Sequence, residues 1–190
     1  MKFDFHLPSF LKKLRRKTAV ILPKDAGAII AFLGISKEDT VVEIGGGNGF
    51  LTSYLARIAK KVITYEKRKD VFEILKQNIE KQNLTNVELI NKDGKKANET
   101  AEFYIIDSNE ATEILEKIFN NVKKGIVAYL PNIEQAKSFH IKSKEYFKNV
   151  FTLRVEVEEW EISERRVRPK HIQLKHTAFL IFGINRKQPE

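Results

Sequence analysis

The stretch Val41-Val42-Glu43-Ile44-Gly45-Gly46-Gly47-Asn48-Gly49 decides the fold of this chain. A mainly apolar segment runs straight into a turn rich in glycine, and the pattern of residues 49–60 that follow is typical of a helix. Glycine allows a sharp turn and lets a ligand lie against bare backbone. The first N–H groups of a helix can receive a polar or anionic ligand. We therefore predict a buried strand over residues 40–44, followed by a ligand-binding turn.

The spacing of the glycines separates the classes of ligand. The dinucleotide fingerprint would require glycine at position 50, where the chain has Phe50, and the Gly-Lys-Ser/Thr sequence of a phosphate-binding P-loop is absent. What remains is an acidic residue followed by glycine at every second position. This pattern is formed by Glu43, Gly45, Gly47 and Gly49.

Predicted strands and helices alternate along the rest of the chain. Apolar runs predict the strands, and amphipathic stretches predict the helices between them. The further expected strands cover residues 61–66, 87–91, 103–106, 125–130, 151–160 and 177–184, and the expected helices cover residues 24–33, 49–60, 69–82, 111–119 and 133–147. Such repeated units predict an α/β fold with a doubly wound, mostly parallel seven-stranded sheet that ends in an antiparallel hairpin.

Acidic residues follow the next two strands. Glu66 ends the second strand, and Asp93-Gly94 follows the third. Because ligands of such sheets bind at the carboxyl ends of the strands, Glu66 can accept hydrogen bonds from both hydroxyls of a ribose, and Asp93 can meet an adenine amino group. The alternative is a tight turn with unrelated surface carboxylates, which leaves unexplained why all three sites fall where a nucleoside would lie.

The charge of the chain favours a polyanionic partner. Its 190 residues include 34 Lys and Arg against 25 Asp and Glu, a net charge of +9. Two interpretations stay open: the basic residues bind RNA phosphate, or they form a solvated surface in which arginines pair with Glu158, Glu159 and Glu161. The basic residues form two clusters, one of Lys12, Lys13, Arg15, Arg16 and Lys17 and one of Arg165, Arg166, Arg168, Lys170 and Lys175.

Several classes of site are not expected. The chain has no cysteine for a disulfide or a thiolate metal site, and its four histidines form no HExxH pattern, so we predict no metal site. No apolar run has the length of a membrane span and no signal peptide is recognisable, so we expect a cytoplasmic protein without membrane contact. Abundant Lys, Glu and Ile are typical of thermophiles.

Three further stretches carry a resemblance to a known family. They are Arg16-Lys17-Thr18-Ala19-Val20-Ile21-Leu22-Pro23-Lys24-Asp25, Arg166-Val167-Arg168-Pro169 and His176-Thr177-Ala178-Phe179-Leu180. The glycine turn resembles motif I of class I methyltransferases. With it, these stretches resemble the tRNA adenine-N1 methyltransferases over residues 12–185, nearly the whole chain.

The resemblance implies a cofactor, a substrate and their binding residues. The cofactor is S-adenosylmethionine, held by Glu43, Gly45, Gly47, Gly49, Glu66 and Asp93. The substrate is tRNA, contacted by Lys12, Lys13, Arg15, Arg16, Arg165, Arg166 and Arg168. In that family the Pro-Lys-Asp segment covers the cofactor, and the final hairpin supports the substrate side.

Asp107 is the candidate catalytic residue. Methylation at adenine N1 makes the base cationic, and a carboxylate beside N1 would hold the base and stabilise that charge. The family has Asp-x-Pro at this strand end, whereas this chain has Asp107-Ser108-Asn109, which changes the loop that aims the carboxylate. A different interpretation is that Asp107 caps the helix that starts near Ala111.

Other departures from the family keep alternative functions open. Members carry a small N-terminal β domain, whereas we expect here a basic extension over residues 1–20 and a cofactor-binding domain over residues 21–190. Ala19 and Leu22 replace the usual Gln and Tyr. The alternatives to an RNA methyltransferase are a catalytically impaired partner subunit of such an enzyme and a corrin-type small-molecule methyltransferase. A homo-oligomer is compatible with each of them. Phe50, Tyr54 and Trp160 are expected in the core or in the wall of the site.

Overall fold

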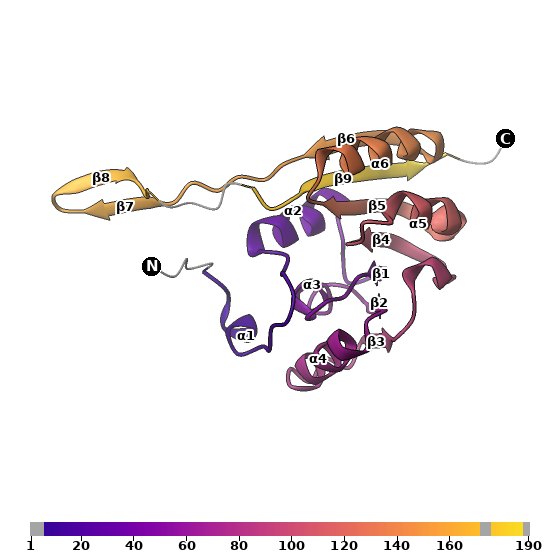
Figure 1. Cartoon of the computed structure of the whole chain (residues 1–190), viewed down its shortest axis with the longest axis horizontal. Coiled ribbons are helices and arrows are strands. Elements are labelled where there is room, and N and C mark those ends of the chain that lie inside the picture. Colours follow the sequence, from indigo (N-terminus) through magenta and orange to yellow (C-terminus); the bar gives the residue numbers. More distant parts are fainter. Residues whose placement is uncertain (1–5, 172–175, 188–190) are drawn as a thin grey trace.

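A twisted seven-stranded sheet forms the centre of the molecule (Figure 1). The computed structural model describes residues 6–171 and 176–187, so Lys175 of the second basic cluster lies outside the described residues. The strand order is β3-β2-β1-β4-β5-β9-β6, and β9 runs antiparallel to both of its neighbours. The strands are β1 (Thr40–Ile44), β2 (Lys61–Tyr65), β3 (Val87–Ile90), β4 (Ala101–Ile106), β5 (Val122–Leu130), β6 (Phe147–Leu153) and β9 (Phe179–Arg186). The predicted fold class is confirmed.

Helices cover both faces of the sheet. Successive strand residues point to opposite faces, so Val41 packs with α2 and α3 while Val42 packs with α5 and α6. The helices are α1 (Ser9–Lys12), α2 (Pro23–Leu33), α3 (Phe50–Leu55), α4 (Lys69–Glu80), α5 (Ala111–Ile118) and α6 (Ile133–Tyr146), with short 3₁₀ turns η1 (Gly94–Lys96) and η2 (Phe119–Asn121). Within the described ranges, none of these helices has the length and apolar character needed to cross a membrane.

The connection between β3 and β4 contains only the single 3₁₀ turn η1 in place of a crossover helix. This turn is anchored tightly, because a Cβ atom on Gly94 would lie 2.2 Å from Ile44 Cγ2 at the end of β1. The short link therefore places the residues after β3 directly beside the glycine turn.

A two-stranded arm leaves the body after β6 (Figure 1). It consists of β7 (Trp160–Ser163) and β8 (Arg166–Pro169), which pair only with each other. The prediction of one strand over residues 151–160 was wrong, because pairing with β9 stops at Leu153 opposite Leu180, although the chain continues with the same alternation. The expectation that Trp160 lies in the core or a site wall was also wrong, since it stands on the arm with 48% of its surface exposed.

A buried ion pair clamps both ends of the arm to the body. The Lys24 ammonium donates to Asp25 Oδ1 at 2.8 Å, to the Val155 carbonyl at 2.8 Å and to Thr177 Oγ1 at 2.6 Å. The Thr177 hydroxyl in turn donates to Asp25 Oδ2 at 2.8 Å. Two of the stretches quoted for the family resemblance thus meet at the arm's root.

The N-terminal segment packs on the glycine turn. Leu11 and Leu14 are buried with Phe50, and Tyr54 packs beside them, as expected for these two aromatic residues. Asn48 Oδ1 accepts hydrogen bonds from the backbone N–H groups of Lys17 at 2.7 Å and Thr18 at 3.3 Å. Residues 17–18 therefore lie across the glycine turn.

Candidate cofactor and active site

A hollow of about 530 Å³ opens at the carboxyl ends of β1, β2 and β4. Its wall includes Gly45, Glu66, Asp93 and Asp107. The volume lies within the range of small-molecule and cofactor sites. The structure therefore brings the glycine turn and three of the carboxylates singled out in the sequence to one cavity.

The glycines of the turn serve different purposes. Gly45 has φ +90°, and a Cβ atom there would lie 2.2 Å from the Asp107 carbonyl oxygen, so only glycine lets these two segments touch. Gly47 has φ +54°, and the nearest atom to its Cβ position is Thr18 Oγ1 at 3.5 Å, so its backbone stays open on one side. Gly49, with φ +79°, immediately precedes α3.

Glu66 lies at the rim of the glycine turn with only 4% of its surface exposed. Its Oε2 accepts from the Gly47 N–H at 3.1 Å, and its Oε1 accepts from the Arg68 N–H at 2.9 Å and from Arg68 Nε at 3.3 Å. A carboxylate has about four acceptor positions. Three of them are filled, so about one position, together with any released by Arg68, is available to a ribose.

Asp93 also lines the hollow, and its side chain forms a hydrogen bond with the backbone. Its Oδ1 accepts from the Lys95 N–H at 2.9 Å and caps η1. This bond fixes the side chain and leaves its second oxygen open to a donor such as an adenine amino group.

Glu43 is buried beneath the turn and does not line the large hollow. The Thr52 hydroxyl donates to its Oε2 at 2.5 Å, which ties β1 to α3. Burial raises the pKa of Glu43 to about 7, against the opposing effect of the hydrogen bond from Thr52. Glu43 instead borders a small cavity of about 20 Å³, which residues 19–21, the glycine turn and Asp107 also line.

Asp107 faces the hollow without a protein partner for its carboxylate. In the described chain its oxygens accept no hydrogen bond and join no ion pair, while its backbone N–H donates to the Ile44 carbonyl at 2.8 Å. The side chain is open to water within the hollow, but the surrounding protein still removes much of its hydration and raises its pKa to about 7. The Glu66 carboxylate acts in the same direction, and Arg68 opposes it.

Asp107 does not cap α5. The residue before that helix is Glu110, no side chain caps it, and the Glu110 N–H bonds to Ser108 Oγ at 3.2 Å. The interpretation of Asp107 as a helix cap was therefore wrong, which leaves its carboxylate free for a ligand.

The basic residues occupy two separate surfaces. Lys12, Lys13, Arg15 and Arg16 are exposed on the N-terminal segment, where the Arg15 guanidinium donates to Gln77 Oε1 at 2.6 Å and the Arg16 guanidinium lies over the Phe50 ring. On the arm, Arg168 pairs with Glu161 at 2.9 Å and Arg166 lies 3.8 Å from the same carboxylate. Arg165 is exposed beside them. Among the described residues, no group of three or more His, Asp or Glu side chains could hold a metal ion.

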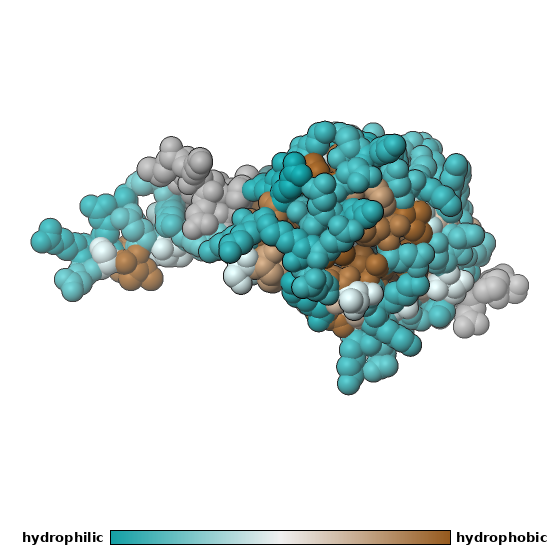
Figure 2. All heavy atoms as spheres, turned by 90° about the horizontal axis from the view of Figure 1, so that it is seen from below, coloured by the Kyte–Doolittle hydropathy of each residue, from teal (hydrophilic) through white to brown (hydrophobic). Residues whose placement is uncertain are grey.

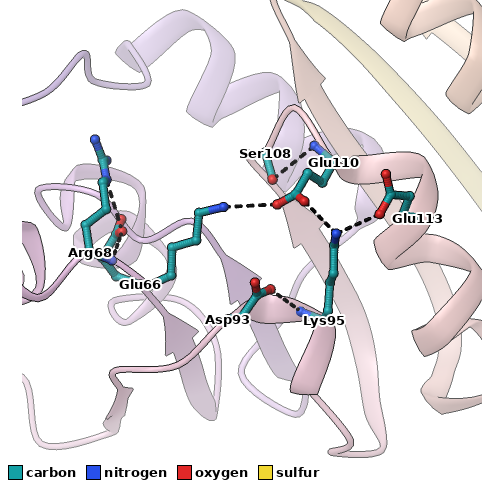
Figure 3. Close-up of polar contacts among 8 residues, drawn as sticks. Glu66, Arg68, Asp93, Lys95, Ser108, Glu110 and Glu113 are labelled. Atoms are coloured by element: carbon teal, nitrogen blue, oxygen red, sulfur yellow. Dashed lines mark hydrogen bonds and ion pairs between the residues drawn. The ribbon is translucent and has the colours of Figure 1, made fainter.

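Three residues at the rim were missed by the sequence analysis. Lys67, Lys95 and Glu110 form ion pairs across the strand ends (Figure 3). Each follows a site carboxylate by one to three residues, and that spacing is the only signal of them in the sequence.

The stability of the chain should depend on pH through Glu43. Because its pKa rises from 4.5 to about 7 on folding, the unfolded chain loses this proton first, and stability falls as pH rises through that window. Glu43→Gln removes the effect. In denaturant unfolding we compare the free energy of unfolding of this variant with that of wild type. The difference in favour of the variant should be larger at pH 8 than at pH 4.5, by up to about 3 kcal/mol. A difference between the two proteins that stays constant with pH would contradict this assignment.

Known proteins resemble this chain in sequence and in fold. The profile of the ribosomal RNA adenine dimethylase family matches residues 23–149. The tRNA (adenine(57)-N(1)/adenine(58)-N(1))-methyltransferase of Methanocaldococcus jannaschii is 33% identical over 90% of this chain and 73% of its own length. The crystal structure of a tRNA (m1A58) methyltransferase from Aquifex aeolicus has a TM-score of 0.88 at 28% identity and covers 95% of this chain and 75% of that one.

A shorter match joins the chain to corrin enzymes. A probable cobalt-precorrin-6B C(15)-methyltransferase of Methanobrevibacter smithii is 41% identical over 42% of this chain and 38% of its own length. The wider matches decide the assignment: this chain belongs to the class I S-adenosylmethionine-dependent methyltransferases, because it matches the profile of the ribosomal RNA adenine dimethylases and is 33% identical to a tRNA adenine-N1 methyltransferase.

Proposed function

We propose that this chain transfers a methyl group from S-adenosylmethionine to an adenine base of RNA, with N1 of an adenine in tRNA as the first candidate. The observation that carries the proposal is the Asp107 carboxylate, which faces the hollow beside Gly45 without a protein partner. A carboxylate in this position can hold an incoming base and offset the positive charge that methylation creates.

The hollow fits the cofactor. It has the volume of a cofactor site, and the Gly45 backbone and the Glu66 and Asp93 carboxylates lie on its wall. In the proposed complex, Glu66 accepts from the ribose and Asp93 from the adenine amino group. S-adenosylmethionine supplies an electrophilic methyl group on a sulfonium. The protein's part is to hold the base in line with that methyl group and to exclude water.

The chemistry at Asp107 requires its ionised form. Asp107 acts as a hydrogen-bond acceptor for the exocyclic amine of the adenine and as a negative charge beside N1. With a pKa of about 7, it is ionised above that pH and neutral below it. The rate of methyl transfer should therefore rise with pH up to about 7 and then level off.

Two relatives named above act on adenine in tRNA, and this supports RNA as the substrate class. The sequence match to a corrin methyltransferase extends over less than half of the chain. The exposed basic residues of the N-terminal segment also favour RNA, because residues 17–18 that follow them lie across the glycine turn. A small corrin substrate needs no such surface.

We propose that RNA phosphates bind to two basic surfaces, which contribute unequally to binding. In the proposal, Lys12, Lys13, Arg15 and Arg16 make the main contacts. Arg165, Arg166 and Arg168 make secondary ones, because Glu161 already pairs with two of them. The basic extension of residues 1–20 thus acts as part of the RNA-binding surface, next to the cofactor domain of residues 21–190.

We also infer that the arm pairs with a second copy of this chain. Trp160 stands opposite Pro169 and Ile162 opposite Val167, so these four side chains share one face of the ribbon. Ile162 is 75% exposed and Val167 65% exposed (Figure 2 shows apolar spheres standing among hydrophilic ones on the arm). An isolated two-stranded ribbon is marginally stable in water. Burial of this apolar face against a partner would therefore stabilise the arm.

The charges of the arm favour its own copy as the partner. Residues 154–170 include five basic and five acidic residues, in a chain whose net charge is +9. A balanced mixture of both signs is self-complementary across a twofold axis, and it leaves the three arm arginines only a secondary attraction for RNA phosphate.

Cofactor binding should depend on Glu66. A charge-assisted hydrogen bond to a ribose hydroxyl contributes roughly 1.5–3 kcal/mol, so Glu66→Ala should weaken S-adenosylmethionine binding about tenfold or more in calorimetry. Glu73→Ala is the matched control, because Glu73 is an exposed carboxylate on α4 outside the hollow. Unchanged affinity in Glu66→Ala would rule out this cofactor site.

Methyl transfer should depend on Asp107. With labelled cofactor and unmodified tRNA, Asp107→Asn should lower the rate roughly a hundredfold or more and remove the pH step near 7, while the cofactor affinity changes little. Glu43→Gln controls for the other carboxyl group with a pKa of about 7 and should keep the step. Wild-type protein that binds the cofactor but methylates no tRNA, even at excess protein, would refute the enzyme and favour a partner subunit.

Assembly through the arm should be visible in solution. Light scattering after size exclusion should give wild-type protein a mass of at least twice the 22.0 kDa of one chain. Ile162→Glu should reduce it to one chain, because a charge on the apolar face would be buried without a partner. Ser163→Glu, on the opposite face, should not. A wild-type mass of 22.0 kDa at the highest concentration reached would exclude the arm as a self-association surface.

A further inference from the structure

We propose that Glu110 is a positioning residue that holds the Asp107 loop in place through Lys67 and Lys95. This inference rests on the proposed function of Asp107 and adds a residue to it. The arrangement is shown in Figure 3, where the side chain of Glu110 reaches both lysines across the strand ends.

The three residues sit on three different loops. Lys67 directly follows Glu66 after β2, Lys95 follows Asp93 by two residues after β3, and Glu110 follows Asp107 by three residues after β4. Each is therefore tied by a short piece of backbone to one of the site carboxylates.

A single carboxylate connects these loops. Glu110 Oε2 accepts from the Lys67 ammonium at 3.0 Å, and its Oε1 accepts from the Lys95 ammonium, which also donates to Glu113 Oε2 at 2.6 Å. The two lysines lower the pKa of Glu110 to about 2, so the connection stays ionised at any pH used for an assay.

Within the described residues, the loop has no other hydrogen bond or ion pair to the neighbouring strand-end loops. For residues 108–110, the remaining hydrogen bonds of the described structure are local: Glu110 N–H to Ser108 Oγ, Ala111 N–H to the Ser108 carbonyl, and Ile114 N–H to the Glu110 carbonyl. Asp107 itself is held only through its backbone, by Ile44 and Gly45. The direction of its side chain therefore depends on the loop that Glu110 anchors.

The other two site carboxylates do not need this anchor. Glu66 is fixed by the N–H groups of Gly47 and Arg68, and Asp93 by the N–H of Lys95. Loss of Glu110 should consequently disturb Asp107 while leaving the cofactor carboxylates in place. This separation distinguishes a positioning role from a general structural one.

A pair of isosteric variants at the start of α5 tests the proposal. Glu110→Gln removes the charge that both lysines share. Glu113→Gln is the matched control, because it removes a second carboxylate from Lys95 in the first turn of α5 and outside the hollow. We expect Glu110→Gln to lower kcat about tenfold to a hundredfold, since a small misplacement of a reacting group has effects of that size. Its Kd for S-adenosylmethionine should stay within about twofold of wild type, and Glu113→Gln should match wild type in both.

Three results would overturn the proposal: an unchanged kcat in Glu110→Gln, an equal loss in both variants, or a parallel loss of kcat and cofactor affinity. Amide hydrogen exchange of residues 108–112 keeps the test independent of catalysis. There, Glu110→Gln should exchange about tenfold faster than wild type and Glu113→Gln should not. If wild type transfers no methyl group, the proposed function fails, and equal exchange in the two variants would then refute the anchor as well.

Discussion

The contact between the backbone of Gly45 and the main-chain carbonyl of Asp107 is the constraint on which the site depends. A Cβ atom at position 45 would come within 2.2 Å of that oxygen, so the carboxyl ends of β1 and β4 approach this closely only because residue 45 is glycine. The Asp107 N–H bonds to the Ile44 carbonyl at 2.8 Å and completes the contact. The glycine turn and the Asp107 loop are thereby made neighbours by the backbone alone.

Polar side chains then fasten the surrounding segments to this centre. Asn48 holds the N-terminal segment across the turn, and the Lys24–Asp25 pair, with Thr177, fixes both ends of the arm. A buried ion pair of this kind contributes little net stability, but removal of one partner is costly because the other charge stays buried. Such contacts select one arrangement of the segments. We propose that Glu110 does the same for the loops at the strand ends.

The parts of the molecule that were predictable from the sequence are those governed by local patterns. The unit from Val41 to Gly49 combines an apolar strand with a glycine turn, and both signals lie within nine residues. The arm was not predictable, because the alternation of residues 151–160 continues after its partner strand has ended at Leu153. The Glu110 contacts were not predictable either, since its partners lie 15 and 43 residues away and become neighbours only when the parallel strands align.

The central claim is that one hollow holds S-adenosylmethionine between the glycine turn and three strand-end carboxylates. A crystal structure of the chain with this cofactor bound tests it most directly. We expect the ribose hydroxyls within hydrogen-bond distance of Glu66, the adenine beside Asp93, and the sulfonium methyl group directed toward Asp107. A cofactor bound with its ribose away from Glu66, or with its methyl group turned away from Asp107, would contradict it.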